Sequence, residues 1–81
     1  MRIDKFLKIS RIIKRRTVAQ VACDGGRIEV NGRDAKPSKD VKAGDIVVVH
    51  FGNDTVKIRI LATPDVANKA NATDLYEVID D

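Results

Sequence analysis

The residues with the clearest chemical potential are cations near the N-terminus. Residues 1–16 hold seven lysines and arginines and a single acidic residue, Asp4. Residues 17–81 hold eight basic and eleven acidic residues, so the net charge of +3 understates the positive charge at this end. A charge run is often only a solvated face, but this density favours a surface that binds phosphates. We call these residues the basic cluster: Arg2, Lys5, Lys8, Arg11, Lys14, Arg15 and Arg16.

No other pattern in the chain points to catalysis or to a bound metal. His50 is the only histidine and Cys23 the only cysteine, so a metal site built from several such ligands and an internal disulfide are both excluded. We expect a structural role for His50 and a buried, unreactive thiol at Cys23. The glycine pair Gly25-Gly26 does not form a phosphate-binding loop, because it lacks that motif's spacing between glycines and the Lys-Ser/Thr that follows them. The sequence therefore predicts a protein that is not an enzyme and needs no cofactor or metal.

Length and composition favour one small ordered domain. Of the 81 residues, 43% are apolar and 33% are charged, which suits a compact core with little room for a deep substrate cavity. No stretch of about 18 apolar residues could span a membrane, and the charged start is unlike a secretory signal. A lone cysteine suits a reducing compartment. We expect one domain over residues 1–81 that acts in the cytoplasm, is monomeric when free, and has no membrane partner.

Two helices and the connection between them should carry the basic cluster. Apolar residues recur at i, i+3 and i+4 between Arg2 and Ser10, which predicts an amphipathic helix with Arg2, Lys5 and Lys8 on another face. A second helix should run from Arg15 to Gly25, with small residues along one stripe, and a Gly-Gly pair should end it. The small side chains along this stripe indicate that the two helices approach each other closely.

The period then changes to two, as in strands. Asn31-Gly32 between two short alternating segments predicts a hairpin over residues 27–36. Further strands should cover 46–51, 56–60 and 75–79, and Thr63-Pro64 should begin a short helix. The predicted fold class is α+β, with two N-terminal helices packed on a small twisted antiparallel sheet.

The three aromatic residues lie in apolar surroundings along the chain. Phe6, Phe51 and Tyr76 all have apolar neighbours, so the sequence does not predict the exposed rings on which unstacked bases are read. Recognition of a phosphate backbone and of a shape is the mode that remains.

Segments 2–19, 26–32 and 41–49 resemble the RNA-binding domain named after small-subunit ribosomal protein S4, also called the alpha-L motif. The resemblance covers about residues 1–51 and leaves 52–81 as a C-terminal extension. It implies that the hairpin edge also faces RNA, which adds four candidates of second rank. These candidates are Asn31, Arg33, Lys36 and Lys39. The hairpin turn alone is enough to explain Asn31, and isolated lysines are often merely solvated.

Two stand-alone subfamilies compete for the resemblance. Segment 1–17, the Phe51-Gly52 turn, segment 75–79 and the acidic end resemble the ribosome-associated quality control factor P subfamily (RqcP). That resemblance implies binding to an obstructed large ribosomal subunit through large-subunit rRNA and P-site peptidyl-tRNA. It also implies an RqcH-like partner that adds C-terminal alanine tails to the stalled chain.

Other functions remain open at this point. The second subfamily, heat-shock protein fifteen, implies recycling of large subunits that carry nascent chains, although its members have a longer, basic C-terminal extension. A general rRNA-binding assembly factor, a DNA-binding or protein-interaction module, and a fragment of an RNA-modifying enzyme are further alternatives.

Overall fold

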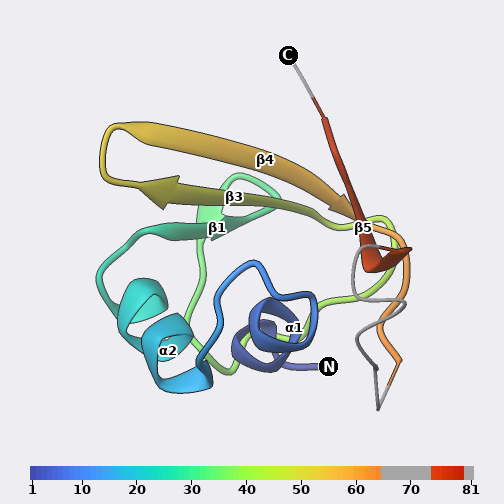
Figure 1. Cartoon of the computed structure of the whole chain (residues 1–81), viewed down its shortest axis with the longest axis horizontal. Coiled ribbons are helices and arrows are strands. Elements are labelled where there is room, and N and C mark those ends of the chain that lie inside the picture. The colour runs from blue at the N-terminus through green and yellow to red at the C-terminus, as the bar shows by residue number, and fades with distance from the viewer. Residues whose placement is uncertain (65–73, 80–81) are drawn as a thin grey trace.

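The basic cluster lies on two short helices at the start of the chain, on the residue before the first helix and on the connection between the two (Figure 1). The computed structural model describes residues 1–64 and 74–79. Helix α1 covers Ile3–Ile9 and helix α2 covers Arg16–Asp24. Both predicted helices are confirmed, and each is one residue shorter at either end than its apolar pattern suggested.

Helix α2 ends at the predicted glycine pair. Gly26 has a φ of 73°, a left-handed conformation that glycine adopts without a steric penalty. Its N–H donates to the carbonyl of Cys23 at 3.1 Å, and the N–H of Arg27 donates to that of Ala22 at 2.9 Å. This pair of hydrogen bonds is a Schellman motif, which satisfies carbonyls left free at the end of the helix.

A five-stranded antiparallel sheet lies against the helices. Its order is β2-β1-β3-β4-β5, and every neighbouring pair is antiparallel. Both helices lie on one face of it (Figure 1). The α+β fold is therefore confirmed. The strands are β1 (Ile28–Val30), β2 (Arg33–Asp34), β3 (Ile46–Phe51), β4 (Asp54–Ile60) and β5 (Tyr76–Val78).

One core joins the helices to the sheet. Phe6 and Leu7 of α1 and Ala19 of α2 have no exposed surface. They share a cluster with residues on the inner face of the central strands, among them Val47 and Val49. Burial of these side chains is the main favourable term in folding. The small residues of α2 let the two helices pack directly on each other, as predicted.

The predicted hairpin turn forms at Asn31-Gly32. Both residues have positive φ, 52° and 85°, which is the conformation of a tight hairpin turn of type I′. The Asn31 side chain also accepts a hydrogen bond from the N–H of Ile46 at 2.9 Å and donates one to Asp45 at 3.2 Å. Its amide therefore ties the hairpin to the start of β3.

The C-terminal strand is confirmed, and the short helix expected after Thr63-Pro64 lies outside the described residues. Strand β5 pairs with the end of β4, where Arg59 contacts Glu77 at 2.6 Å. In the part of the chain that the structure describes, no helix has the length and apolar character needed to cross a bilayer.

Phe51 corrects the interpretation of the aromatic residues. Phe6 is fully buried, but the Phe51 side chain is 43% exposed. Along β3 it shares a face with Val47 and Val49, which are buried under the helices. Because β3 extends past the helices that cover its centre, the ring emerges at the end of that layer. Apolar neighbours in sequence did not reveal that the strand is longer than its cover.

His50 has the structural role predicted for it. Its side chain lies on the other face of β3, with Nε2 2.7 Å from Glu29 and Nδ1 3.3 Å from Thr55. These contacts link three neighbouring strands of the sheet.

Cys23 should be almost inert in the folded protein. Its side chain is 3% exposed, and burial, helped by the negative charges of Asp4 and Asp24, raises the pKa of the thiol from 9.0 to about 11. Because the thiolate is the nucleophile, we expect Cys23 to react about 100-fold more slowly in the folded chain than in the urea-unfolded chain. The rate of labelling by Ellman's reagent at pH 8 checks this, and equal rates would contradict the buried position.

Candidate RNA-binding surface

One fully buried acidic side chain lies at the contact between the two helices. Asp4 has no exposed surface. Its Oδ2 accepts hydrogen bonds from Arg2 at 3.1 Å and from Gln20 at 3.0 Å, and Oδ1 accepts one from the backbone N–H of Lys5 at 2.7 Å. Arg16 approaches both oxygens, with Nε 3.3 Å from Oδ2 and Nη2 3.4 Å from Oδ1. We call Asp4, Arg2, Arg16 and Gln20 the Asp4 clamp.

The clamp is ionic at neutral pH. Burial raises the pKa of Asp4, but hydrogen bonds from Gln20, Arg16 and the N–H of Lys5 outweigh it and hold the pKa below its usual 3.8. A charged carboxylate is a stronger acceptor than a neutral one. The contact between α1 and α2 therefore contains a fixed negative charge that forms ion pairs with two arginines.

The position of Arg2 differs from the prediction. Its spacing placed it with Lys5 and Lys8 on one face of a helix, but Arg2 precedes α1 in an extended conformation (φ −70°, ψ 144°). It forms an isolated antiparallel bridge with Asp40. The chain before α1 is thus held by a loop distant in sequence, a constraint that helical periodicity does not contain.

The clamp brings together two arginines from different elements. Arg2 comes from the residue before α1 and Arg16 from the first turn of α2. Their side chains stay 50% and 42% exposed although both touch a carboxylate with no exposure. Asp4 therefore fixes one side of each guanidinium and leaves the rest open to a ligand.

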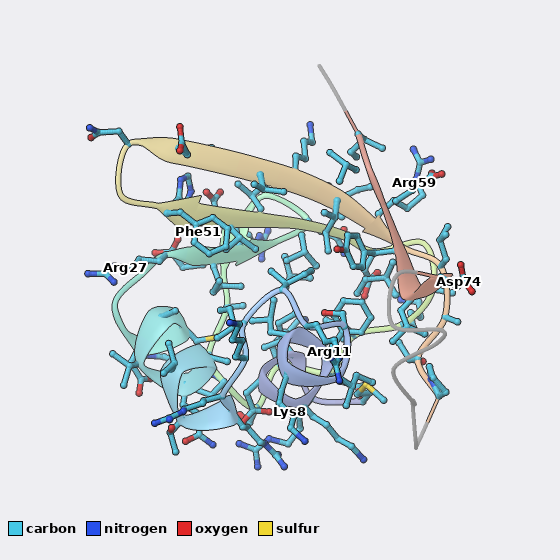
Figure 2. All side chains as sticks on the ribbon, viewed as in Figure 1. Lys8, Arg11, Arg27, Phe51, Arg59 and Asp74 are labelled. Atoms are coloured by element: carbon cyan, nitrogen blue, oxygen red, sulfur yellow. The ribbon has the colours of Figure 1, made fainter. Side chains whose placement is uncertain are left out.

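The connection between the helices keeps the other cations at the surface. Arg11 has a φ of 63°, which is uncommon for a residue with a side chain, and the chain turns out of α1 there. Ile13 then returns to the core, with its N–H bonded to the carbonyl of Leu7 at 3.0 Å. Figure 2 shows Lys8 and Arg11 at α1. The exposed cations are Lys8, Arg11, Lys14 and Arg15, and Lys5 is half-buried.

The start of α2 adds to the positive field. Arg15 occupies the N-cap, and no acidic residue lies in the first turn, so the positive end of the helix dipole is not compensated within it. Among the described residues, Arg2 and Arg16 of the basic cluster form ion pairs with Asp4. Glu77, near the C-terminal end of the described chain, pairs instead with Arg59 on the sheet.

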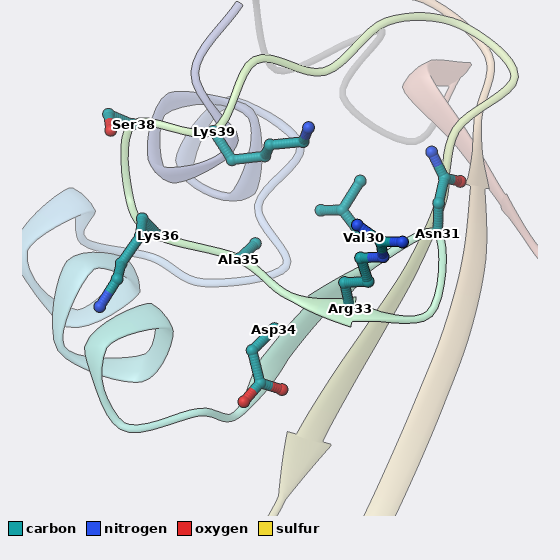
Figure 3. A pocket seen from close by; sticks show the side chains of 8 residues that line it. All are labelled: Val30, Asn31, Arg33, Asp34, Ala35, Lys36, Ser38 and Lys39. Carbon is teal, nitrogen blue, oxygen red and sulfur yellow. The ribbon is translucent and has the colours of Figure 1, made fainter.

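The four candidates of second rank lie together at a hollow beside the β1–β2 hairpin. The hollow has a volume of about 360 Å³. In Figure 3, Arg33 and Lys39 lie on the same side of it as Asn31, whereas Lys36 points the other way. Asp34 also lines the hollow and reduces its positive charge. The Asn31 amide is already engaged within the fold.

Sequence reasoning missed the clamp because Asp4 and Gln20 were not singled out. A usable signal exists: Asp4 is the only acid among seven cations, and it lies within the apolar pattern of α1. A lone acid there is a candidate for a buried partner of nearby arginines.

Comparison with known proteins places the chain among RNA-binding proteins. Residues 1–47 match the family described as the S4 domain. The chain is similar to the RQC P-site tRNA stabilizing factor of Streptococcus pneumoniae, with 51% identity over 98% of this chain and 90% of the relative. The corresponding factor of Bacillus subtilis is 47% identical over 98% of this chain and 92% of the relative.

Similarity extends to the second subfamily. The heat shock protein 15 homologue of Aeromonas salmonicida is 38% identical over 75% of this chain but only 46% of the relative. The crystal structure of heat shock protein 15 from Vibrio cholerae has a TM-score of 0.89 and 35% identity, and the match covers 98% of this chain and 81% of that one. The fold is thus common to both subfamilies, whereas the length agrees with the P-site factors.

Removal of the clamp carboxylate should destabilise the protein. Asp4→Ala leaves two guanidinium groups and the Gln20 amide without their shared acceptor, and we expect a loss of about 2–3 kcal/mol in the free energy of unfolding. The loss stays below that of a fully buried pair because both arginines are half exposed. Urea unfolding followed by circular dichroism measures it, and Asp24→Ala, an exposed acid on α2, is the control. Equal effects of the two variants would contradict the clamp.

The same carboxylate should make the protein sensitive to acid. Because the pKa of Asp4 is lower in the folded state, its stabilisation is complete above about pH 5 and is lost as pH falls below 3.8 toward the folded-state pKa. Asp4→Asn should therefore be less stable at pH 7 and should lose less of its remaining stability between pH 5 and pH 2.5. Midpoints of urea unfolding across this range are the measurement, and parallel curves for the two proteins would rule out the effect.

Proposed function

The chain belongs to the S4 domain family and to its RQC P-site tRNA stabilizing factors, and on this premise we propose that it binds a large ribosomal subunit obstructed by peptidyl-tRNA. The P-site tRNA stabilizing factors are non-catalytic RNA-binding factors. In our proposal the chain contacts large-subunit rRNA and the peptidyl-tRNA in the P site. It acts in the cytoplasm and holds the tRNA while an RqcH-like factor extends the stalled chain with alanine.

The observation that carries the proposal is the pair of arginines in the Asp4 clamp. Arg2 and Arg16 are oriented before any ligand arrives, since Asp4 fixes one side of each guanidinium. An arginine that is already ordered loses less conformational entropy on binding. Its planar fork matches the oxygens of a phosphate, so the clamp suits the backbone of a folded RNA.

The remaining cations extend this contact. Exposed cations around the clamp would follow neighbouring phosphates and supply sequence-independent affinity. These are Lys8, Arg11, Lys14 and Arg15, and the half-buried Lys5 adds its charge beside them. The hairpin hollow would form a second contact in which Arg33 and Lys39 face the RNA, Lys36 contributes from the side, and Asn31 keeps the hairpin in place.

A second candidate function is the recycling of large subunits in the manner of heat-shock protein fifteen. The TM-score of 0.89 to the Vibrio cholerae protein favours it. The two functions differ in outcome: the first requires alanine tails on stalled chains, and the second does not. Loss of these tails in a deletion strain, restored by the wild-type gene, supports the first function, and unchanged tailing supports the second.

Charge reversal on the basic cluster should release the protein from large subunits. Arg2, Arg11 and Arg16 changed together to glutamate should abolish co-sedimentation. Because Arg2 and Arg16 also contact Asp4, a second variant, Lys8→Glu with Arg11→Glu, leaves the clamp intact and should weaken binding at least tenfold. Lys42→Glu with Arg59→Glu carries the same change of charge outside the cluster and is the control. If the cluster variants sediment like this control, the RNA-binding surface lies elsewhere.

Affinity for RNA should fall steeply with salt. About five phosphate contacts predict a slope near −4 in a plot of log association constant against log salt concentration. Fluorescence anisotropy with a structured rRNA fragment at several salt concentrations measures the slope, which should become less steep in Lys8→Glu with Arg11→Glu. A slope near zero would exclude a phosphate-based interface. Equal affinity for duplex DNA of the same length would argue against recognition of RNA shape.

A further inference from the structure

A groove without an assigned role lies between α2 and the outer end of β3. It has a volume of about 340 Å³, near the lower end of the range for small-ligand sites. Ile12 and Val18 line it on the helical side, and Phe51 lines it on the sheet side. Val18 is 52% exposed and Phe51 is 43% exposed. Part of its apolar wall is thus open to solvent.

The architecture explains why an aromatic ring is left uncovered there. Phe51 occupies the inner face of β3, in the same row as Val47 and Val49, and pairs with Asp54 at the end of the β3–β4 hairpin. The helices cover Val47 and Val49 but not Phe51. Its ring therefore stands at the open end of the layer between sheet and helix, where a flat partner has access to it.

The charges around the groove favour an anionic partner. Arg27 lines it, and no carboxylate is among its described lining residues. Figure 2 shows Arg27 and Phe51 at the same end of the molecule, above α2. The imidazole of His50 is fixed by Glu29 and Thr55 on the sheet, so Arg27 supplies the available positive charge. An apolar wall with an arginine at its rim suits a ligand with an aromatic ring and a negative charge some distance from that ring.

We propose that this groove holds one unpaired base of the bound RNA, stacked on Phe51, with the phosphate of that nucleotide at Arg27. The inference rests on the proposed function and adds to it a site for a single nucleotide. Stacking accepts any base, because every base has an aromatic face. The site would therefore recognise an unpaired nucleotide and not a particular sequence.

The position of the groove favours RNA over a peptide. Its lining residues Ile12 and Ile13 are followed directly in the chain by Lys14 and Arg15 of the basic cluster. An RNA backbone on that cluster runs next to the groove, so an unpaired nucleotide reaches it without a second binding partner. An apolar peptide segment would gain nothing from Arg27.

The test compares two short RNA duplexes that have the same base pairs. One is blunt and fully paired, and the other carries a single additional, bulged adenosine in one strand. Wild-type protein should bind the bulged duplex about tenfold more tightly, a difference within the range measured for one stacked base. Phe51→Tyr, which keeps an aromatic face, should retain this preference. Phe51→Leu, which keeps apolar volume only, should lose most of it, and Arg27→Gln should reduce it. Arg59→Gln, at an exposed cation on β4, should leave it unchanged.

The outcomes separate this inference from the proposed function. Binding of the fully paired duplex depends on the basic cluster and should be the same in both Phe51 variants. Their melting temperatures, measured alongside, test whether the fold is intact. Equal affinity of the wild-type protein for the two duplexes overturns the nucleotide site alone. If Phe51→Leu and Phe51→Tyr prefer the bulged duplex to the same degree, no base stacks on the ring and the nucleotide site is also overturned. An apolar peptide is then the occupant that fits the groove. Failure to bind either duplex at low salt overturns both proposals.

Discussion

The buried Asp4 carboxylate is the interaction on which the rest of the RNA-binding surface depends. A charge without solvent exposure is costly unless it is paired and hydrogen-bonded. Asp4 meets this condition with the backbone N–H of Lys5 in α1, with Arg16 and Gln20 in α2, and with Arg2 before α1. The same contacts that make its burial tolerable also fix the angle between the helices and the direction of two arginines. Stability and ligand recognition are therefore coupled at this one side chain.

This arrangement concentrates positive charge at the surface while one negative charge lies inside. The cations of the basic cluster repel one another, and the buried carboxylate lowers that repulsion without occupying the exposed sides of the guanidinium groups. Two acids of the sheet have partners there, Glu29 with His50 and Glu77 with Arg59. The field that faces a polyanion is thus stronger than the net charge of +3 indicates.

The outer end of the sheet has a different character. Strands β3 and β4 extend beyond the helices, and the inner face continues there without a cover. Inward-facing side chains beyond the covered part become a surface, and Phe51 is the clearest of them. The basic cluster and this apolar groove meet at residues 12–15, so a phosphate-binding region and a region suited to a base adjoin each other.

The elements of the fold could be predicted from the sequence because their signals are local. Spacing of apolar residues located both helices, a glycine pair ended the second, Asn31-Gly32 set the hairpin, and the count of cations near the N-terminus indicated a polyanion partner. The tertiary structure alone decided which charges are buried and which rings are exposed. Asp4 is buried because Gln20 and Arg16 reach it from another helix, and Phe51 is exposed because no helix reaches it. Both facts depend on contacts between segments distant in the chain, which a local pattern does not contain.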